Sequence, residues 1–95
     1  MYFRRRRGRP PKAKRITYDY RPREFYVQNA LESVVLNFSE LEAMRLVDYE
    51  GLSLEEASAR MSVSKSTVWR LLRSGRRKIV DALIRGKRIV IKEGY

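Results

Sequence analysis

The 95-residue sequence contains no cysteine and no histidine. Without cysteine there can be no disulfide bond, no thiolate nucleophile and no thiolate metal site. Without histidine, the commonest general base and the commonest metal ligand are missing too. The serines therefore lack their usual activating base, and Glu55 and Glu56 are sequence neighbours that diverge around a helix. We expect a protein that is not an enzyme and that has no metal or cofactor.

Long hydrophobic runs are missing as well. No apolar stretch is long enough to span a bilayer, and the N-terminus has no signal-peptide pattern, so we expect a cytoplasmic protein without a membrane partner. The 95 residues are expected to form one small domain. A domain of this size buries only about 60–65% of its unfolded surface, so a second subunit would be unsurprising.

The basic residues are segregated along the chain, which carries a net charge of +11. Residues 1–23 hold ten Lys or Arg against one Asp, and residues 64–88 hold nine against one. Between them, residues 24–63 hold two Lys or Arg against eight Asp or Glu. Positive charge concentrated in an arm and in one later segment is typical of a protein that binds a polyanion. The pattern predicts a nucleic-acid partner and association with the nucleoid.

Residues 1–15 are predicted to form a basic arm that cannot bury apolar area and is disordered in isolation. Within it, residues 7–10 resemble the Arg-Gly-Arg-Pro core of the AT-hook, which lies extended in narrow A·T minor grooves. Binding to phosphates regardless of sequence is the alternative. The residues expected to contact the minor groove or the backbone are Arg4, Arg5, Arg6, Arg7, Gly8, Arg9, Pro10 and Lys12.

Residues 16–95 are predicted to form the folded domain, mainly α-helical with short strands near the two ends. Alternation of apolar and polar residues predicts a strand over residues 16–20. Residues 88–92 are β-prone and are expected to form an edge strand, paired either with residues 16–20 or with another chain. Residues 34–36 suit either a strand or the lead into the next helix.

Three helices are predicted from their caps. Ser39 with Glu42 matches a capping box and predicts a first helix that ends at Gly51. Ser53 with Glu56 matches a second box, opening a helix over residues 54–61. Its expected inward residues are Leu54, Ala57 and Met61.

The third predicted helix starts after Ser64 and runs about 20 residues, roughly 30 Å, to Gly86. Its predicted inward stripe consists of Val68, Leu72, Gly75, Ile79 and Ala82/Leu83. A short acidic helix, a tight turn and a longer basic helix over residues 52–73 form the pattern of a helix-turn-helix, whose second helix enters the major groove of DNA.

The predicted stripe fixes which residues of the third helix face outward. Those expected to contact base edges are Lys65, Ser66, Trp69, Arg70 and Arg73. Those expected to contact phosphates are Ser64, Thr67, Arg76, Arg77 and Lys78. For Ser64 a purely capping role is the alternative, and for Trp69 the alternative is to cover the edge of the core.

Residues 34–94 resemble an uncharacterised family of small prokaryotic proteins. The resemblance rests on VVLNFSELEAMRLVDYEGLSLEEA (34–57), RRKIVDAL (76–83) and GKRIVIKEG (86–94). It implies DNA binding through a helix-turn-helix similar to region four of sigma factors. Ser62 stands where such turns usually have glycine, and Ser58 where the first helix of the motif has alanine. The chain lacks the N-terminal cysteines of many members, so no metal role is implied.

The combined expectation is sequence-specific binding to double-stranded DNA and regulation of transcription. A homodimer is expected, with two recognition helices about 34 Å apart on a palindrome. One alternative is a sigma-like module that contacts RNA polymerase. A second is an RNA-binding protein, since an arginine-rich arm also suits structured RNA. A third is the separate targeting domain of a recombinase.

Overall fold

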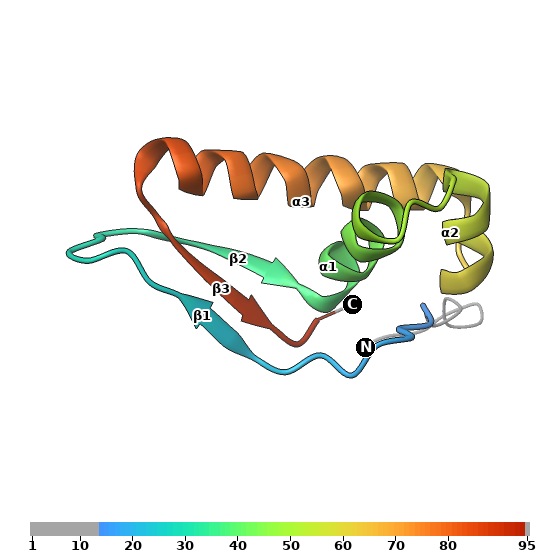
Figure 1. Ribbon diagram of the computed structural model, residues 1–95, viewed down its shortest axis with the longest axis horizontal. Helices are drawn as coiled ribbons and strands as arrows, with labels where there is room; N and C mark the ends of the chain where they lie inside the picture. The colour runs from blue at the N-terminus through green and yellow to red at the C-terminus, as the bar shows by residue number, and fades with distance from the viewer. Residues whose placement is uncertain (1–13, 95) are drawn as a thin grey trace, which may run out of the picture.

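The computed structural model describes residues 14–94, so all the predicted arm contacts from Arg4 to Lys12 lie outside the described range. The described residues contain three α-helices, one π-helical turn and a three-stranded sheet, in agreement with a mainly α-helical fold (Figure 1). None of the helices in this part of the chain has both the length and the apolar character needed to cross a membrane.

The sheet contains β1 (Arg23–Phe25), β2 (Ser33–Asn37) and β3 (Arg88–Lys92) in the order β1-β3-β2. β3 pairs antiparallel with β1 and parallel with β2. The prediction of a strand at 88–92 is therefore confirmed, but its placement at a sheet edge is wrong, because β3 is the central strand. Residues 34–36 belong to a strand.

The strand predicted over residues 16–20 is also wrong. The backbone nitrogen of Thr17 donates to the side chain of Glu42, at 2.8 Å, and not to a neighbouring strand. The tyrosines on either side of Asp19 contact each other with their rings tilted by 49°, and the ring centroids of Tyr18 and Tyr20 lie 5.1 Å apart. Side-chain contacts thus fix this segment in an extended but irregular path, and the strand begins only after Pro22.

Helix α1 (Phe38–Met44) begins two residues earlier than the sequence pattern predicted. Its N-cap is Asn37, and the reciprocal capping bonds join Asn37 to Glu40 and not Ser39 to Glu42. Ser39 and Glu42 are instead fully buried. The helix continues into the π-helical turn η1 (Arg45–Tyr49), and the predicted terminating residue Gly51 follows its C-cap Glu50. Gly51 has φ of 78°, as expected of a residue that ends a helix in the left-handed region.

Helices α2 (Leu54–Met61) and α3 (Lys65–Arg85) have the predicted bounds and caps. The Ser53–Glu56 capping box is present, and Ser64 caps α3 by accepting from the backbone nitrogen of Thr67. Gly86 ends α3 with φ of 65°. Between the helices, Ser62 adopts the left-handed conformation with φ of 57°. The tight turn expected here is therefore made by a residue with a Cβ atom.

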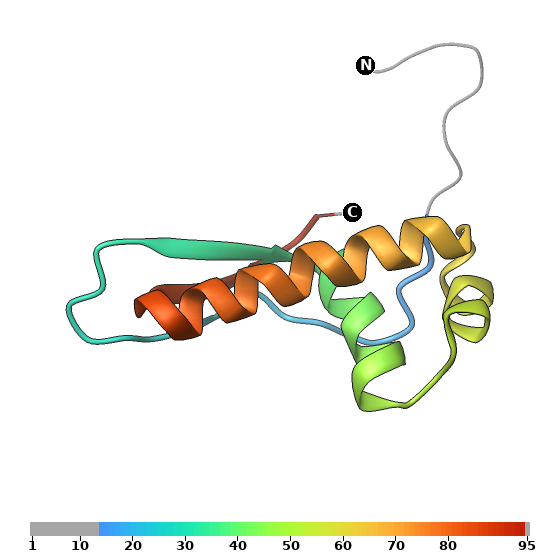
Figure 2. The ribbon, with the colours of Figure 1, turned by 90° about the horizontal axis from the view of Figure 1, so that it is seen from above.

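Helix α3 lies along one face of the sheet and extends past it to α2 (Figures 1 and 2). Its predicted inward stripe is correct at Val68, Leu72, Gly75 and Ala82, which are buried, and Ile79 is partly buried. Leu83 is 73% exposed, so its inward placement is wrong. At that turn only Ala82 faces inward, and near the start of the helix Leu71 joins Val68 and Leu72 on the buried side.

Two apolar clusters hold these layers together. The larger joins η1, α2 and the first half of α3, and its fully buried members include Leu46, Met61 and Leu72. The smaller lies between β2, β3 and the second half of α3. Met44 packs against both clusters. A Cβ atom at Gly75 would lie 2.9 Å from Met44 Cε, so the glycine permits the close approach of α1 and α3.

Candidate nucleic-acid interface

The first half of α3 presents a polar and basic side to solvent. Burial of Val68 and Leu72 fixes the rotation of the helix, so that the opposite side faces outward. The side chains predicted to contact bases all lie on this exposed side: Lys65, Ser66, Trp69, Arg70 and Arg73. Trp69 is 47% exposed, so it is half available and half packed against its neighbours. The structure thus brings together the five predicted residues on one surface.

Three hydroxyl groups gather where α3 begins. The hydroxyl of Ser64 lies 3.0 Å from that of Ser66 and 2.9 Å from that of Thr67, while its oxygen also caps the Thr67 nitrogen at 3.1 Å. The capping role of Ser64 is therefore present in the structure. The first turn of a helix carries backbone nitrogens without helical partners, and together with these hydroxyls they suit an oxygen-rich anion such as phosphate.

The predicted phosphate-contacting residues further along α3 fall into two groups. Arg76 donates to both carboxylate oxygens of Asp48, at 3.1 and 2.6 Å, and this pairing raises the pKa of Arg76. Lys78 donates to the carboxylate of Glu40, at 3.0 Å, and to the backbone oxygen of Val35, at 2.8 Å. These two cations are therefore engaged within the protein. Arg77 is exposed.

Four cations of α3 remain without an ion-pair partner among residues 14–94: Lys65, Arg70, Arg73 and Arg77. All four are exposed. Unpaired cations on one side of a helix keep their full charge available to an external polyanion. The outward side of α3 is thus a cationic surface, and the paired residues Arg76 and Lys78 flank it.

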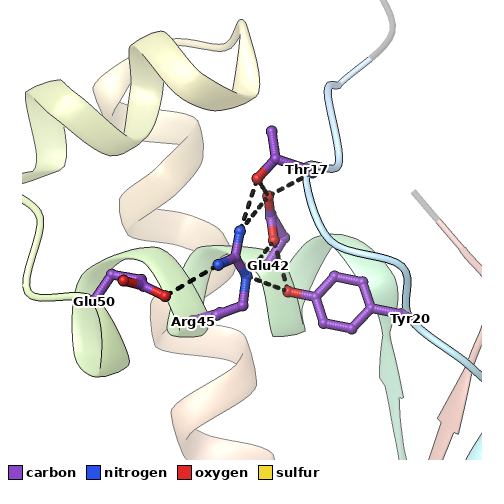
Figure 3. A network of polar contacts seen from close by, with 5 residues as sticks. All are labelled: Thr17, Tyr20, Glu42, Arg45 and Glu50. Carbon is purple, nitrogen blue, oxygen red and sulfur yellow. Dashed lines mark hydrogen bonds and ion pairs between the residues drawn. The ribbon is translucent and has the colours of Figure 1, made fainter.

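The segment that precedes the sheet is fixed to α1 by a buried carboxylate (Figure 3). Glu42 accepts hydrogen bonds from the backbone and hydroxyl of Thr17, from the hydroxyl of Tyr20 at 2.6 Å, and from Arg45. Burial alone would raise the pKa of Glu42, but these hydrogen bonds outweigh it and lower the pKa below its usual value. Burial and the nearby Glu42 carboxylate raise the pKa of Tyr20. Glu42 is therefore ionised and Tyr20 neutral at neutral pH.

Arg15 fixes the start of this segment beside the end of α2. Its backbone nitrogen donates to the Met61 oxygen at 2.9 Å, and its guanidinium donates to the Ala59 oxygen at 2.9 Å. Both acceptors are carbonyl groups of the last turn of α2, where a cation is favoured. The first described residues therefore lie next to the end of α2, at the same end of the molecule as the start of α3 (Figure 2).

Sequence reasoning missed this anchoring network. The sequence pattern predicts that Glu42 caps the helix. Two residues nearer the N-terminus, Asn37 and Glu40 fit a capping box equally well, and these are the residues that form it. With Asn37 as the cap, Glu42 becomes an acid within an otherwise buried face, which is a signal for a paired carboxylate. Its partners Thr17 and Tyr20 lie more than 20 residues away in sequence, so no local pattern connects them.

Comparison with known families places the chain in a group whose activity is not assigned. It matches the family described as protein of unknown function DUF134 over residues 3–95. The chain therefore belongs to that family. No solved structure matches it.

Curated relatives support the same membership. A UPF0251 protein of Pyrococcus furiosus is 40% identical over 90 residues, which cover 90% of this chain and 83% of the relative. A UPF0251 protein of Moorella thermoacetica is 45% identical over 93 residues, which cover 92% of this chain and 61% of the relative. A UPF0251 protein of Methanococcus vannielii is 53% identical over 68 residues, which cover 72% of this chain and 52% of the relative. The chain spans about half the length of several of the relatives that it matches.

Proposed function

We propose that this protein binds double-stranded DNA in a sequence-dependent manner and regulates transcription. In this proposal α2 and α3 act as a helix-turn-helix and α3 enters the major groove. The observation that carries it is the set of four exposed, unpaired cations on one side of α3, next to the hydroxyl cluster at the start of that helix. A helix of about 30 Å with such a side fits the major groove in width and charge.

Specific contacts are assigned by position along α3. Residues near its start are assigned to base edges: Lys65, Ser66, Trp69, Arg70 and Arg73. Ser64, Thr67 and Arg77 are assigned to phosphates. The sequence also predicts phosphate contacts for Arg76 and Lys78. In the structure they pair with Asp48 and Glu40, so a phosphate would compete with these carboxylates.

The basic arm supplies the second part of the proposed interface. Arg15 holds the described chain at the end of α2, beside the proposed recognition helix, and we propose that residues 1–13 take part in binding as a basic arm. Their arginines are then available to phosphates or to the adjacent minor groove. We therefore propose that the arm raises affinity and makes it strongly dependent on salt.

We retain the homodimer as a proposal, but on a different surface from the one that sequence suggested. β3 is flanked on both sides, so it offers no free edge. Helix α3 instead exposes Val80, Leu83 and Ile84, which are 50%, 73% and 76% exposed. Packing of this stripe against the same stripe of a second copy would remove the apolar side chains from water, as a symmetric dimer requires.

The function is tested by selection of bound sequences from random DNA duplexes. Full-length protein and a variant that comprises residues 16–95 are used in parallel. An enriched motif recovered with both proteins is the expected result, and it would assign specificity to α3. An A·T preference seen only with the full chain would assign it to the arm. Equal recovery of all sequences by both proteins would refute sequence-dependent binding.

A further inference from the structure

An apolar groove of about 610 Å³ lies on the side of the molecule where α1, η1 and the sheet meet. Cavities that bind small organic molecules in proteins commonly measure about 300–1,000 Å³. Side chains from β1, β2, β3, α1, η1, α3 and residues 18–21 line it. The groove is thus built by most elements of the fold and is separate from the exposed side of the first half of α3.

The floor of the groove is the smaller apolar cluster. Leu36 and Ile91 are buried there, with 1% and 6% of their surface exposed. The hydrophobic side chains around them are only partly buried: Leu41, Met44, Ile79 and Ile89. Apolar surface left accessible to water in a concave site favours an apolar occupant, because covering it releases about 25 cal/mol per Å².

Aromatic rings stand at the rim. Tyr18, Phe25 and Tyr49 line the groove and are 57%, 54% and 83% exposed. They come from three separate parts of the chain: the segment before the sheet, β1 and η1. Aromatic faces and edges at these positions favour contact with a flat ring over an aliphatic chain.

The charged side chains at the groove are mostly positive. Its lining includes Arg21, Arg23 and Arg45, against Glu50 as the only acid among the described residues that line it. Arg45 is held by Glu42 and Glu50, and Arg21 pairs with Asp19 at 3.1 Å. Arg23 is exposed and makes no ion pair within residues 14–94. A guanidinium without a partner at the edge of an apolar groove favours a carboxylate.

We propose that this groove binds a small aromatic carboxylate. Its flat ring packs on the partly buried side chains of Leu41, Ile79 and Ile89 and against the exposed aromatic rings, and its carboxylate pairs with Arg23. The site does not involve the proposed DNA-contacting residues, so this inference and the proposed function can fail separately.

Naphthalene-2-carboxylate is a suitable probe. We expect it to bind the full-length chain in calorimetry, and to shift backbone amide resonances of groove-lining residues in a two-dimensional NMR titration. The neutral naphthalene-2-carboxamide should bind at least about tenfold more weakly, since it lacks the charge that Arg23 recognises. Equal affinity for the two compounds, or shifts confined to other residues, would overturn the proposal.

Variants at exposed positions test the site without disturbing the core. Arg23→Glu and Phe25→Ala should each weaken binding by about tenfold or more. The matched controls are Lys92→Glu, an exposed cation on the neighbouring strand, and Tyr26→Ala, the ring next in sequence to Phe25 that does not line the groove. They should bind within about twofold of the natural chain. Unchanged affinity of Arg23→Glu, with all variants folded, would refute the proposal.

Another occupant of the groove would also be detected. If the groove is filled by a segment of the protein, removal of residues 1–13 should shift the same amide resonances in the absence of the probe. If the groove is filled by a second copy of the protein, dilution should shift the same amide resonances in the absence of the probe. Either result would overturn the assignment to a small molecule, whereas resonances that respond only to the probe would support it.

Discussion

Thr17 donates two hydrogen bonds to the carboxylate of Glu42, from its backbone nitrogen at 2.8 Å and from its hydroxyl at 2.6 Å. The same carboxylate also accepts hydrogen bonds from the Tyr20 hydroxyl and the Arg45 guanidinium. One buried side chain on α1 therefore fixes the direction in which the N-terminal segment leaves the domain. We expect the anchoring to matter for both stability and the position of the arm.

Substitution Glu42→Gln should destabilise the fold. The amide is similar in shape but neutral, and it leaves Arg45 without its buried counter-charge. We expect a loss of about 2–4 kcal/mol in the free energy of unfolding, measured by denaturant titration. Glu93→Gln, at an exposed position near the C-terminus, is the control and should change stability by less than about 0.5 kcal/mol. A loss no larger than that of the control would contradict this role of Glu42.

The lowered pKa of Glu42 also makes stability depend on pH. In the unfolded chain this carboxyl has an ordinary pKa of about 4.3, so the unfolded state takes up protons first as pH falls. The contribution of Glu42 is therefore fully present above about pH 5 and is lost as pH falls through its lower folded pKa. Unfolding curves from pH 6 to pH 2.5 should show a steeper decline for the natural chain than for Glu42→Gln. Parallel declines would rule the prediction out.

The turn between α2 and α3 offers a stabilising substitution. Ser62 has φ of 57°, which costs a residue with a Cβ atom about 1 kcal/mol relative to glycine. Ser62→Gly should raise the free energy of unfolding by about 0.5–1 kcal/mol and the melting temperature by a few degrees. Ser58→Gly, at a helical position in α2, should lower both. If both substitutions lower stability equally, the left-handed turn carries no strain.

The proposed dimer can be tested on the exposed stripe of α3. Leu83→Glu places a charge where two copies would bury apolar surface, so sedimentation equilibrium should show monomers where the natural chain forms dimers. Leu31→Glu is the matched control, because Leu31 is 97% exposed and lies between β1 and β2. It should leave the dimer intact. A natural chain that is monomeric at all concentrations would refute the dimer.

Local patterns predicted the helices of the second half of the chain well. α2 and α3 have strong caps, Ser53 with Glu56 and Ser64 with Thr67, and their ends are marked by left-handed residues. Capping depends on residues three positions apart, so a single candidate pattern, as at α2 and α3, locates the helix start. Before α1 two overlapping patterns compete, and the sequence did not distinguish them. The predicted burial of Val68 and Leu72 also implied that Arg70 and Arg73 are exposed, as the structure has them.

Other features depend on contacts that sequence does not display. The central position of β3 results from pairing with β1 and β2, each more than 50 residues distant. β3 begins and ends with the charged residues Arg88 and Lys92, which are typical of an edge strand, so its composition did not indicate a central position. The engagement of Arg76 by Asp48 likewise depends on the packing of η1 against α3. Contacts between residues far apart in sequence therefore determine which cations of α3 have an ion-pair partner.

The most direct test of the central claim measures DNA affinity of α3 variants on the duplex obtained by selection. Fluorescence anisotropy of a labelled duplex is recorded with the natural chain, Arg70→Ala, Arg73→Ala and Lys92→Ala. If α3 enters the major groove, the first two should each lose about 10- to 100-fold in affinity, while the Lys92 variant loses at most about threefold. Circular dichroism confirms that each variant is folded. Natural affinity in both arginine variants would contradict the proposed interface.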